Sequence, residues 1–173
     1  MEIFIEFLKI VLPAAAVLYA MYLVVKSFLN KELQKTHMEI RNKSMETVLP
    51  NRLHAYERMV LFLERISPGN LVVRLNNGDY TSREFQQILL NEIRSEYNHN
   101  VSQQLYMSDE VWSLILHAKE DLISTINQAT DSLGEDADNV DLSRKVLEIT
   151  MAKEQDPVQV ALKHLKDEIR QIF

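Results

Sequence analysis

Apolar residues recur at helical spacing through most of the chain, with polar residues between them. One such stripe follows residue 50 and predicts an amphipathic helix over about 51–66. Similar stripes predict helices from 82 to about 106, from 109 to beyond 126 and from 142 to about 153. The helical pattern does not continue after residue 66, because Pro68 and Gly69 stop the first helix. We therefore expect 71–80 to be extended coil that lies over the helices.

Three helix starts carry capping signals. Thr81 and Glu84 match a capping box, in which each side chain bonds the other residue's backbone N–H. Ser108 precedes two acidic residues that suit the positive end of a helix dipole. Asp156-Pro157 places an N-cap directly before a proline at the first helical position. These signals fix where the predicted helices begin.

The last helix carries a regular apolar seam. Its members alternate at spacings of four and three residues and are Val158, Leu162, Leu165, Ile169 and Ile172. Packing against the rest of the bundle is the default interpretation of this pattern, and pairing with a partner helix is the alternative. The preceding stretch 131–141 holds five acidic residues and no base. Asp136-x-Asp138 resembles the opening of a calcium loop but lacks the sixth-position glycine and the final glutamate, so we expect a solvated linker.

The N-terminal segment contains an uncharged run from Ile10 to Val25, flanked by Lys9 and Lys26. Its sixteen residues span about 24 Å of helix, and apolar neighbours on both sides extend it toward the ~30 Å hydrocarbon core of a bilayer. The flanking lysines suit the headgroup region. We therefore expect a transmembrane anchor, although a run of this length alone would also allow a buried helix.

Basic residues set the expected orientation. Five of them lie between residues 26 and 43, whereas Lys9 alone precedes the run. The positive-inside rule then puts the N-terminus outside and the C-terminal domain in the cytoplasm of an inner-membrane, single-pass protein.

These patterns predict an all-α fold: a transmembrane helix that continues into a stalk, then a small helical bundle that ends in a heptad helix. The expected divisions are an anchor over 1–29, a juxtamembrane stalk over 30–50, a helical core over 51–130, the acidic linker over 131–141, and a C-terminal helical pair over 142–173.

Composition narrows the function. The chain has no cysteine, which excludes disulfides and thiolate chemistry. Residues 51–173 carry thirteen Lys/Arg against twenty Asp/Glu, so nucleic acid is not an expected partner. Patterns for nucleophilic catalysis and phosphate binding are missing from the sequence, and we expect no cofactor and identify no small-molecule substrate.

The densest polar stretch runs from Glu96 to Gln104. Glu96-x-x-His99 has the spacing of di-iron carboxylate bundles, although such a site needs a second copy of the motif, which the sequence lacks. The alternative is a hydrogen-bonding or partner-contacting helix surface rich in amides, formed by Asn98, Asn100, Gln103 and Gln104. We favour the second interpretation.

Several segments resemble a family of small membrane-anchored proteins from Bacteroidota that has no assigned function. They are RLHAYERMVLFL (52–63), EYNHNVSQQLYMS (96–108), Val111-Trp112 and Ala118–Glu120. The resemblance covers most of the chain up to about Ile126. It implies a Gram-negative inner-membrane location and assigns no catalytic residue.

The sequence thus favours a non-enzymatic accessory or scaffold subunit of an inner-membrane complex. Its expected partners are the lipid bilayer and other membrane or cytoplasmic proteins, further copies of itself included. The alternative is a membrane-tethered metal-binding bundle or metalloenzyme that uses Glu96 and His99.

Overall fold

The computed structural model describes residues 1–171, and within 1–50 it leaves out the side chains at 2–8, 10, 11, 13, 14, 37, 40–42, 44, 45 and 47. The chain divides into two compact units, Met1–Pro50 and Asn51–Phe173. Helix α1 (Glu2–Ile66) belongs to both, and Pro50 lies at the division. The sequence places a helix break at this proline. The helix instead continues through it, although proline cannot donate the backbone hydrogen bond to the preceding turn.

In the first unit, the described side chains of α1 are exposed, apart from the partly exposed Leu49. Lys35 and Glu39 form an ion pair of 3.9 Å, one helical turn apart. The rings of Tyr19 and Tyr22 stack with centroids 6.5 Å apart. The ammonium of Lys26 lies 5.8 Å from the centroid of the Tyr22 ring.

The expected transmembrane anchor is corrected by the structure. Among the residues whose side chains are described, no helix is both long enough and apolar enough to cross a membrane. Four positions of the predicted run, at 10, 11, 13 and 14, lie outside those described side chains, and the continuous remainder is Ala15–Val25. On this finding the predictions of a transmembrane helix and of a single-pass inner-membrane protein are wrong. The bilayer as a partner, and Lys9 and Lys26 as membrane-flanking residues, stay predictions.

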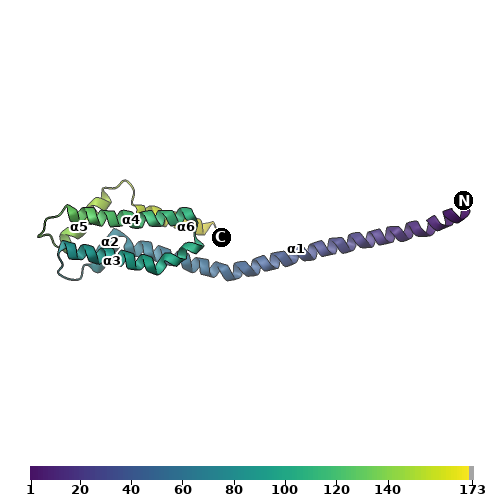
Figure 1. The fold of residues 1–173 in the computed structure, drawn as a ribbon, viewed down its shortest axis with the longest axis horizontal. Coiled ribbons are helices and arrows are strands. Elements are labelled where there is room, and N and C mark those ends of the chain that lie inside the picture. Colours follow the sequence, from purple (N-terminus) through teal and green to yellow (C-terminus); the bar gives the residue numbers. More distant parts are fainter. Residues whose placement is uncertain (172–173) are drawn as a thin grey trace. The chain divides into compact units, whose positions relative to one another are not determined.

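The second unit is built from short helices, and the all-α prediction is confirmed (Figure 1). After α1 come α2 (Pro68–Leu75), α3 (Ser82–Asn100), the 3₁₀ helix η1 (Val101–Tyr106), α4 (Asp109–Asp131), α5 (Asn139–Met151) and α6 (Pro157–Arg170). Helix α4 packs against α3, α5 and α6, and α5 also contacts α2 and α3. The capping box at Thr81 and the N-caps at Ser108 and Asp156 form as predicted.

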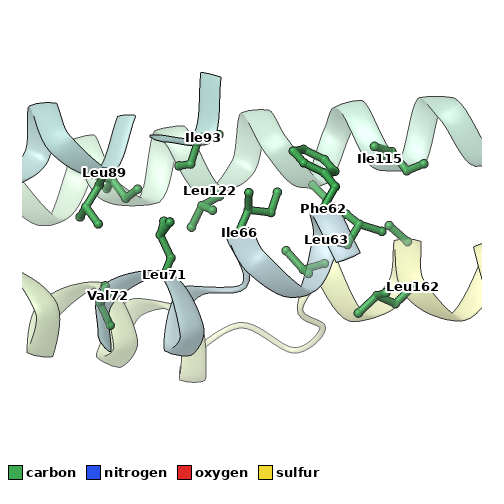
Figure 2. Close-up of a cluster of buried hydrophobic side chains, with 14 of the residues drawn as sticks. Phe62, Leu63, Ile66, Leu71, Val72, Leu89, Ile93, Ile115, Leu122 and Leu162 are labelled. Atoms are coloured by element: carbon green, nitrogen blue, oxygen red, sulfur yellow. The ribbon is translucent and has the colours of Figure 1, made fainter. Parts of the chain in front are cut away.

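The core of this unit is formed by one apolar side from each of its α-helices (Figure 2). Phe62, Leu63 and Ile66 of α1 point into it, together with Leu89 and Ile93 of α3. Ile115 and Leu122 of α4 and Leu162 of α6 complete the labelled group, and all of these side chains are buried. The predicted stripes therefore meet in one continuous core.

Segment 68–75 differs from its prediction. It forms helix α2 rather than extended coil, and it buries Leu71 and Val72 in the core. Pro68 occupies the first helical position, where its missing N–H costs no hydrogen bond and its fixed φ suits the helix. Pro68, which was expected to stop the first helix, therefore begins α2.

The acidic segment is attached to the core rather than solvated along its length. Thr81 and Asp138 form an antiparallel bridge, in which Ser82 N–H donates to the carbonyl of Ala137 at 2.9 Å. Asn139 N–H donates to the carbonyl of Tyr80 at 3.1 Å. The side chain of Asp138 caps α5 by accepting from the N–H groups of Val140 and Asp141. These bonds join the loop before α3 to the loop before α5.

Candidate functional site

The predicted metal candidates are engaged with other groups. The carboxylate of Glu96 lies 2.6 Å from Nε of Arg65, in an ion pair between α3 and α1. Nδ1 of His99 lies 2.8 Å from the carbonyl oxygen of Ser95 on its own helix. Within the described part of the chain, no group of three or more His, Asp or Glu side chains is placed to hold a metal ion.

The predicted amide surface divides into buried and exposed members. Asn100 is buried, with 7% of its surface exposed, and its Nδ2 donates to the carbonyl of Glu96 at 2.8 Å. Its Oδ1 accepts from Nε of Arg58 at 3.1 Å. Asn98 and Gln104 are exposed, and Gln103 is half-buried and donates to the hydroxyl of Ser102. Asn100 therefore ties α3 to α1, while a partner role for the other three stays a prediction.

The predicted heptad seam lies largely inside the chain's own core. Val158, Leu162 and Leu165 are buried, and Ile169 is partly buried against the same core. Ile172 lies outside the described residues. In this arrangement α4 covers the seam, and its predicted pairing with a partner helix stays a prediction.

Two adjoining pockets open where α1, α2 and α3 meet. The first has a volume of about 440 Å³ and is lined by Leu61, Glu64, Arg65, Gly69, Asn70, Val73 and Arg74. The second has a volume of about 350 Å³ and is lined by Arg58, Leu61, Phe62, Arg65, Glu96, His99 and Asn100. Leu61 and Arg65 line both, so we refer to the two together as the Leu61 pockets.

Apolar side chains stand exposed in the Leu61 pockets. Leu61 is 54% exposed and Val73 is 77% exposed, although both belong to well-formed helices. Gly69 lines the first pocket with these two side chains, and a Cβ added there would meet no heavy atom within 4 Å, so the space beside Gly69 is open. The Leu61 pockets thus combine aliphatic surface with unfilled space.

Ion pairs border this surface. Arg74 lies 2.6 Å from the carboxylate of Glu92, which Arg65 also approaches at 3.6 Å. The hydrogen bond from Arg74 is the main cause that lowers the pKa of Glu92; burial opposes it, and the charges of Arg74 and Arg65 add to the lowering. Glu92 is therefore a carboxylate at neutral pH, which suits an ion pair and does not suit a general acid. Glu92 therefore serves as the shared acceptor of Arg74 and Arg65 at the border of this surface.

Little in the pattern of residues predicts the Leu61 pockets. Leu61 and Arg65 are four residues apart and share one side of α1, which is readable as helical spacing. Val73 and Arg74 reach the same place only because 68–75 is a helix. The missed signal was Pro68, which marks a helix start as readily as a helix end.

A second polar cluster joins α1, α4 and α6. The carboxylate of Glu168 accepts hydrogen bonds from the hydroxyls of Tyr56 and Ser108, and from Ser108 N–H at 3.0 Å. Burial raises the pKa of Glu168, but the bonds from Ser108 and Tyr56 and the charge of Arg52 outweigh it, and the net pKa is lowered. Burial and the bond to Glu168 raise the pKa of Tyr56. The hydrogen-bond partners of Glu168 belong to the chain itself, so this cluster stabilises the packing of α1, α4 and α6.

Comparisons with known proteins identify a family. A protein family described as "Family of unknown function (DUF7935)" matches residues 2–172. This agrees with the expected membership in a family without an assigned function, and the description names neither Bacteroidota nor a membrane. No curated protein and no solved structure matches the chain.

Proposed function

The chain belongs to this family of unknown function, and we propose that it is a non-enzymatic docking subunit that binds a partner protein through the Leu61 pockets. The observation that carries the proposal is the exposure of Leu61 and Val73 around open space at Gly69. Aliphatic residues on one side of adjacent helices are normally turned into a core, and a contiguous exposed group is typical of an interaction site.

The shape of the surface favours a protein over a small ligand. Small-molecule sites are concave and bury 70% or more of a ligand, with roughly 300–1,000 Å³ of space. The Leu61 pockets have such volumes, but the two side chains between and beside them protrude toward solvent. Arginine borders them on α1 and α2, and arginine is enriched at protein interfaces. A protein surface would cover the protruding side chains, whereas a small ligand would leave them exposed to solvent.

Site-specific photo-cross-linking in the native cells tests the proposal. A photoreactive residue replaces Val73 in the full chain, and a second chain carries it instead of the exposed Arg144 on α5. We expect a discrete adduct of one protein from position 73, which is absent from position 144. Leu61→Glu should abolish that adduct, because it places a charge on the docking surface without burying it in the core.

The control is the fold of the variant. Leu61→Glu should leave the circular dichroism melt within about 0.5 kcal/mol of wild type, as surface substitutions usually do. Adducts that are the same from both positions, or that persist in Leu61→Glu, would contradict the proposal. So would the absence of any discrete adduct from position 73.

A further inference from the structure

The pair Asn77-Gly78 is the chain's one Asn-Gly sequence, and both residues are exposed. Helix α2 ends at Leu75 and α3 begins at Ser82, so the pair belongs to the loop that joins these helices. Every other asparagine except Asn76 lies within a helix. Asn77 therefore combines a side chain exposed to solvent with a loop backbone and a following glycine.

The backbone nitrogen of Gly78 has no bonding partner that would hold it back from reaction. The N–H groups of Asn76 and Asn77 donate to the carbonyls of Val72 and Leu75, but the N–H of Gly78 has no acceptor among the described residues. Glycine also lacks a Cβ, which allows a neighbouring group to approach its backbone closely. The nitrogen of Gly78 is thus available as a nucleophile for Cγ of the Asn77 side chain.

Tyr80 lies against the same amide. Its hydroxyl donates to Oδ1 of Asn77 at 3.5 Å, and a Cβ added at Gly78 would lie 3.0 Å from Cζ of its ring. The ring stacks on Phe85 of α3, with centroids 6.3 Å apart and an angle of 4° between the planes, so α3 holds its position. Attack on Cγ places negative charge on Oδ1, which a hydrogen-bond donor stabilises. Hydrogen bonds of this kind are often long in the resting structure and shorten in the transition state.

We propose that Asn77 is a site of spontaneous deamidation, in which the Gly78 nitrogen attacks Cγ and the Tyr80 hydroxyl stabilises the oxyanion at Oδ1. A bond forms between this nitrogen and Cγ, and the nitrogen loses its proton. The bond from Cγ to Nδ2 breaks, so the amide and that proton leave as ammonia and a succinimide remains. Water then opens the succinimide. Opening at Cγ gives aspartate, and opening at the main-chain carbonyl carbon gives isoaspartate.

Deamidation at this position acts on the start of α5. The carbonyl of Gly78 accepts from Nδ2 of Asn139 at 2.7 Å, and the same Nδ2 also donates to Oδ1 of Asn76. Asn139 is buried and is the first residue of α5. An isoaspartate adds a methylene to the main chain just before Gly78, which displaces this carbonyl from Asn139. The isoaspartyl chain should therefore unfold more easily than the original chain.

Peptide mapping of the purified full chain tests the proposal. Cleavage after Arg74 and Arg83 releases residues 75–83, and mass spectrometry of samples aged at neutral pH follows the conversion of amide to acid. Asn76 lies in the same peptide and is the internal control. We expect conversion at Asn77 to a mixture of aspartate and isoaspartate, at least about tenfold faster than at Asn76, because the residue after Asn76 has a side chain.

Tyr80→Phe isolates the hydroxyl, since the ring remains to stack on Phe85. The rate at Asn77 should fall about two- to tenfold, as for the loss of one hydrogen bond in the transition state. A looser loop would raise the rate instead, so a fall is not explained by disruption of the loop. Tyr106→Phe, at a partly exposed position on η1, is the matched control and should leave the rate unchanged. In chains unfolded by urea, wild type and Tyr80→Phe should react at the same rate.

The outcomes separate the parts of the proposal. Conversion at Asn77 no faster than at Asn76 would overturn the site. An unchanged rate in Tyr80→Phe, or an equal fall in Tyr106→Phe, would overturn the role of the hydroxyl. The isoaspartyl chain, separated by chromatography, should unfold at a lower urea concentration than Asn77→Asp, which has the same charge without the added methylene. Equal midpoints would overturn the effect on α5.

Discussion

The side chain of Glu168 on α6 connects that helix to α1 and to the start of α4. Its carboxylate accepts from Tyr56 on α1 and from the backbone and hydroxyl of Ser108 at the start of α4. A charged acceptor contributes about 1.5–3 kcal/mol per hydrogen bond, more than a neutral one. Glu168→Gln keeps the shape and removes the charge, so it isolates that difference.

We expect Glu168→Gln to lower the free energy of unfolding by about 1–3 kcal/mol at neutral pH. Glu154→Gln, at an exposed position without a side-chain partner, is the matched control and should change little. Urea unfolding followed by circular dichroism measures both. A loss in Glu168→Gln no larger than in Glu154→Gln would contradict the structural role of the carboxylate.

The same carboxylate predicts a pH dependence. Because the folded-state pKa of Glu168 lies below the ordinary value of 4.5, its stabilisation is present above pH 4.5 and is lost as pH falls through the folded pKa. The raised pKa of Tyr56 acts at the other end, where stability present below pH 10 is lost as pH rises through the folded value. The difference between wild type and Glu168→Gln should therefore shrink in acid, and unfolding curves at pH 7 and pH 3.5 check it.

Substitution of glycine by alanine should change the stability of the chain differently at Gly69 and at Gly78. Gly69→Ala should stabilise the chain by up to about 1 kcal/mol, because the position is helical and the added Cβ meets open space. At Gly78 the Cβ would lie 3.0 Å from the Tyr80 ring, so Gly78→Ala must displace that side chain and should give no gain. Thermal melts of the two variants compare them directly. A larger gain at Gly78 would show that the loop, not α2, has the free space.

At the scale of elements, helix starts were the most readable feature of the sequence. Thr81, Ser108 and Asp156 each have a capping side chain whose function is local, so the sequence alone identified them. Helix α2 was missed because Pro68 and Gly69 serve equally well to stop a helix, and only the burial of Leu71 and Val72 decides between the two. Local signals were sufficient for caps and insufficient where tertiary packing selects the structure.

The candidate site was less predictable than the fold for the same reason. Asn100 was recognised as polar and notable, yet its role depends on Arg58, which lies 42 residues away in sequence. Leu61 looks like any apolar residue of a helix until the neighbouring helices leave it uncovered. Exposure of this kind depends on three helices at once, and one-dimensional spacing does not record it.

The acidic segment before α5 gives an element-scale prediction. Asp138→Ala should cost about 1 kcal/mol, because it removes the N-cap that accepts from Val140 and Asp141. Asp136→Ala changes an exposed residue two positions away without such bonds and should stay within about 0.5 kcal/mol of wild type. Chemical denaturation of both variants checks the pair. Equal costs would indicate that the segment acts through its charge rather than through the cap.

At the scale of the whole second unit, α6 completes the core. Val158, Leu162 and Leu165 are buried against α4 and the neighbouring helices, and burial of each contributes about 1.5–3 kcal/mol. Together they contribute roughly 5–9 kcal/mol, which is comparable to the whole stability of a typical domain at about 5–15 kcal/mol. The unit therefore depends on its last helix.

A chain that ends at Gln155 should accordingly lose cooperative unfolding and bind the dye ANS through the uncovered face of α4. A chain that ends at Gln171 keeps every described contact of α6 and should melt like wild type. Calorimetry and dye fluorescence measure the comparison. A sharp transition in the shorter chain would mean that α1 to α5 form a sufficient core.

The contact between Tyr56 and Glu168 also has a consequence for synthesis. The two residues are 112 positions apart, and ribosomes add about 5–20 residues per second. Roughly 6–22 s therefore pass between the translation of Tyr56 and that of its partner. In the last part of that interval, once α4 (Asp109–Asp131) has been translated, the nascent chain presents the α4 surface that α6 later covers, which is the kind of surface that chaperones bind. The aggregation-prone surface of α4 is therefore covered only when α6, the fourteen-residue helix Pro157–Arg170, has been translated and packs against it.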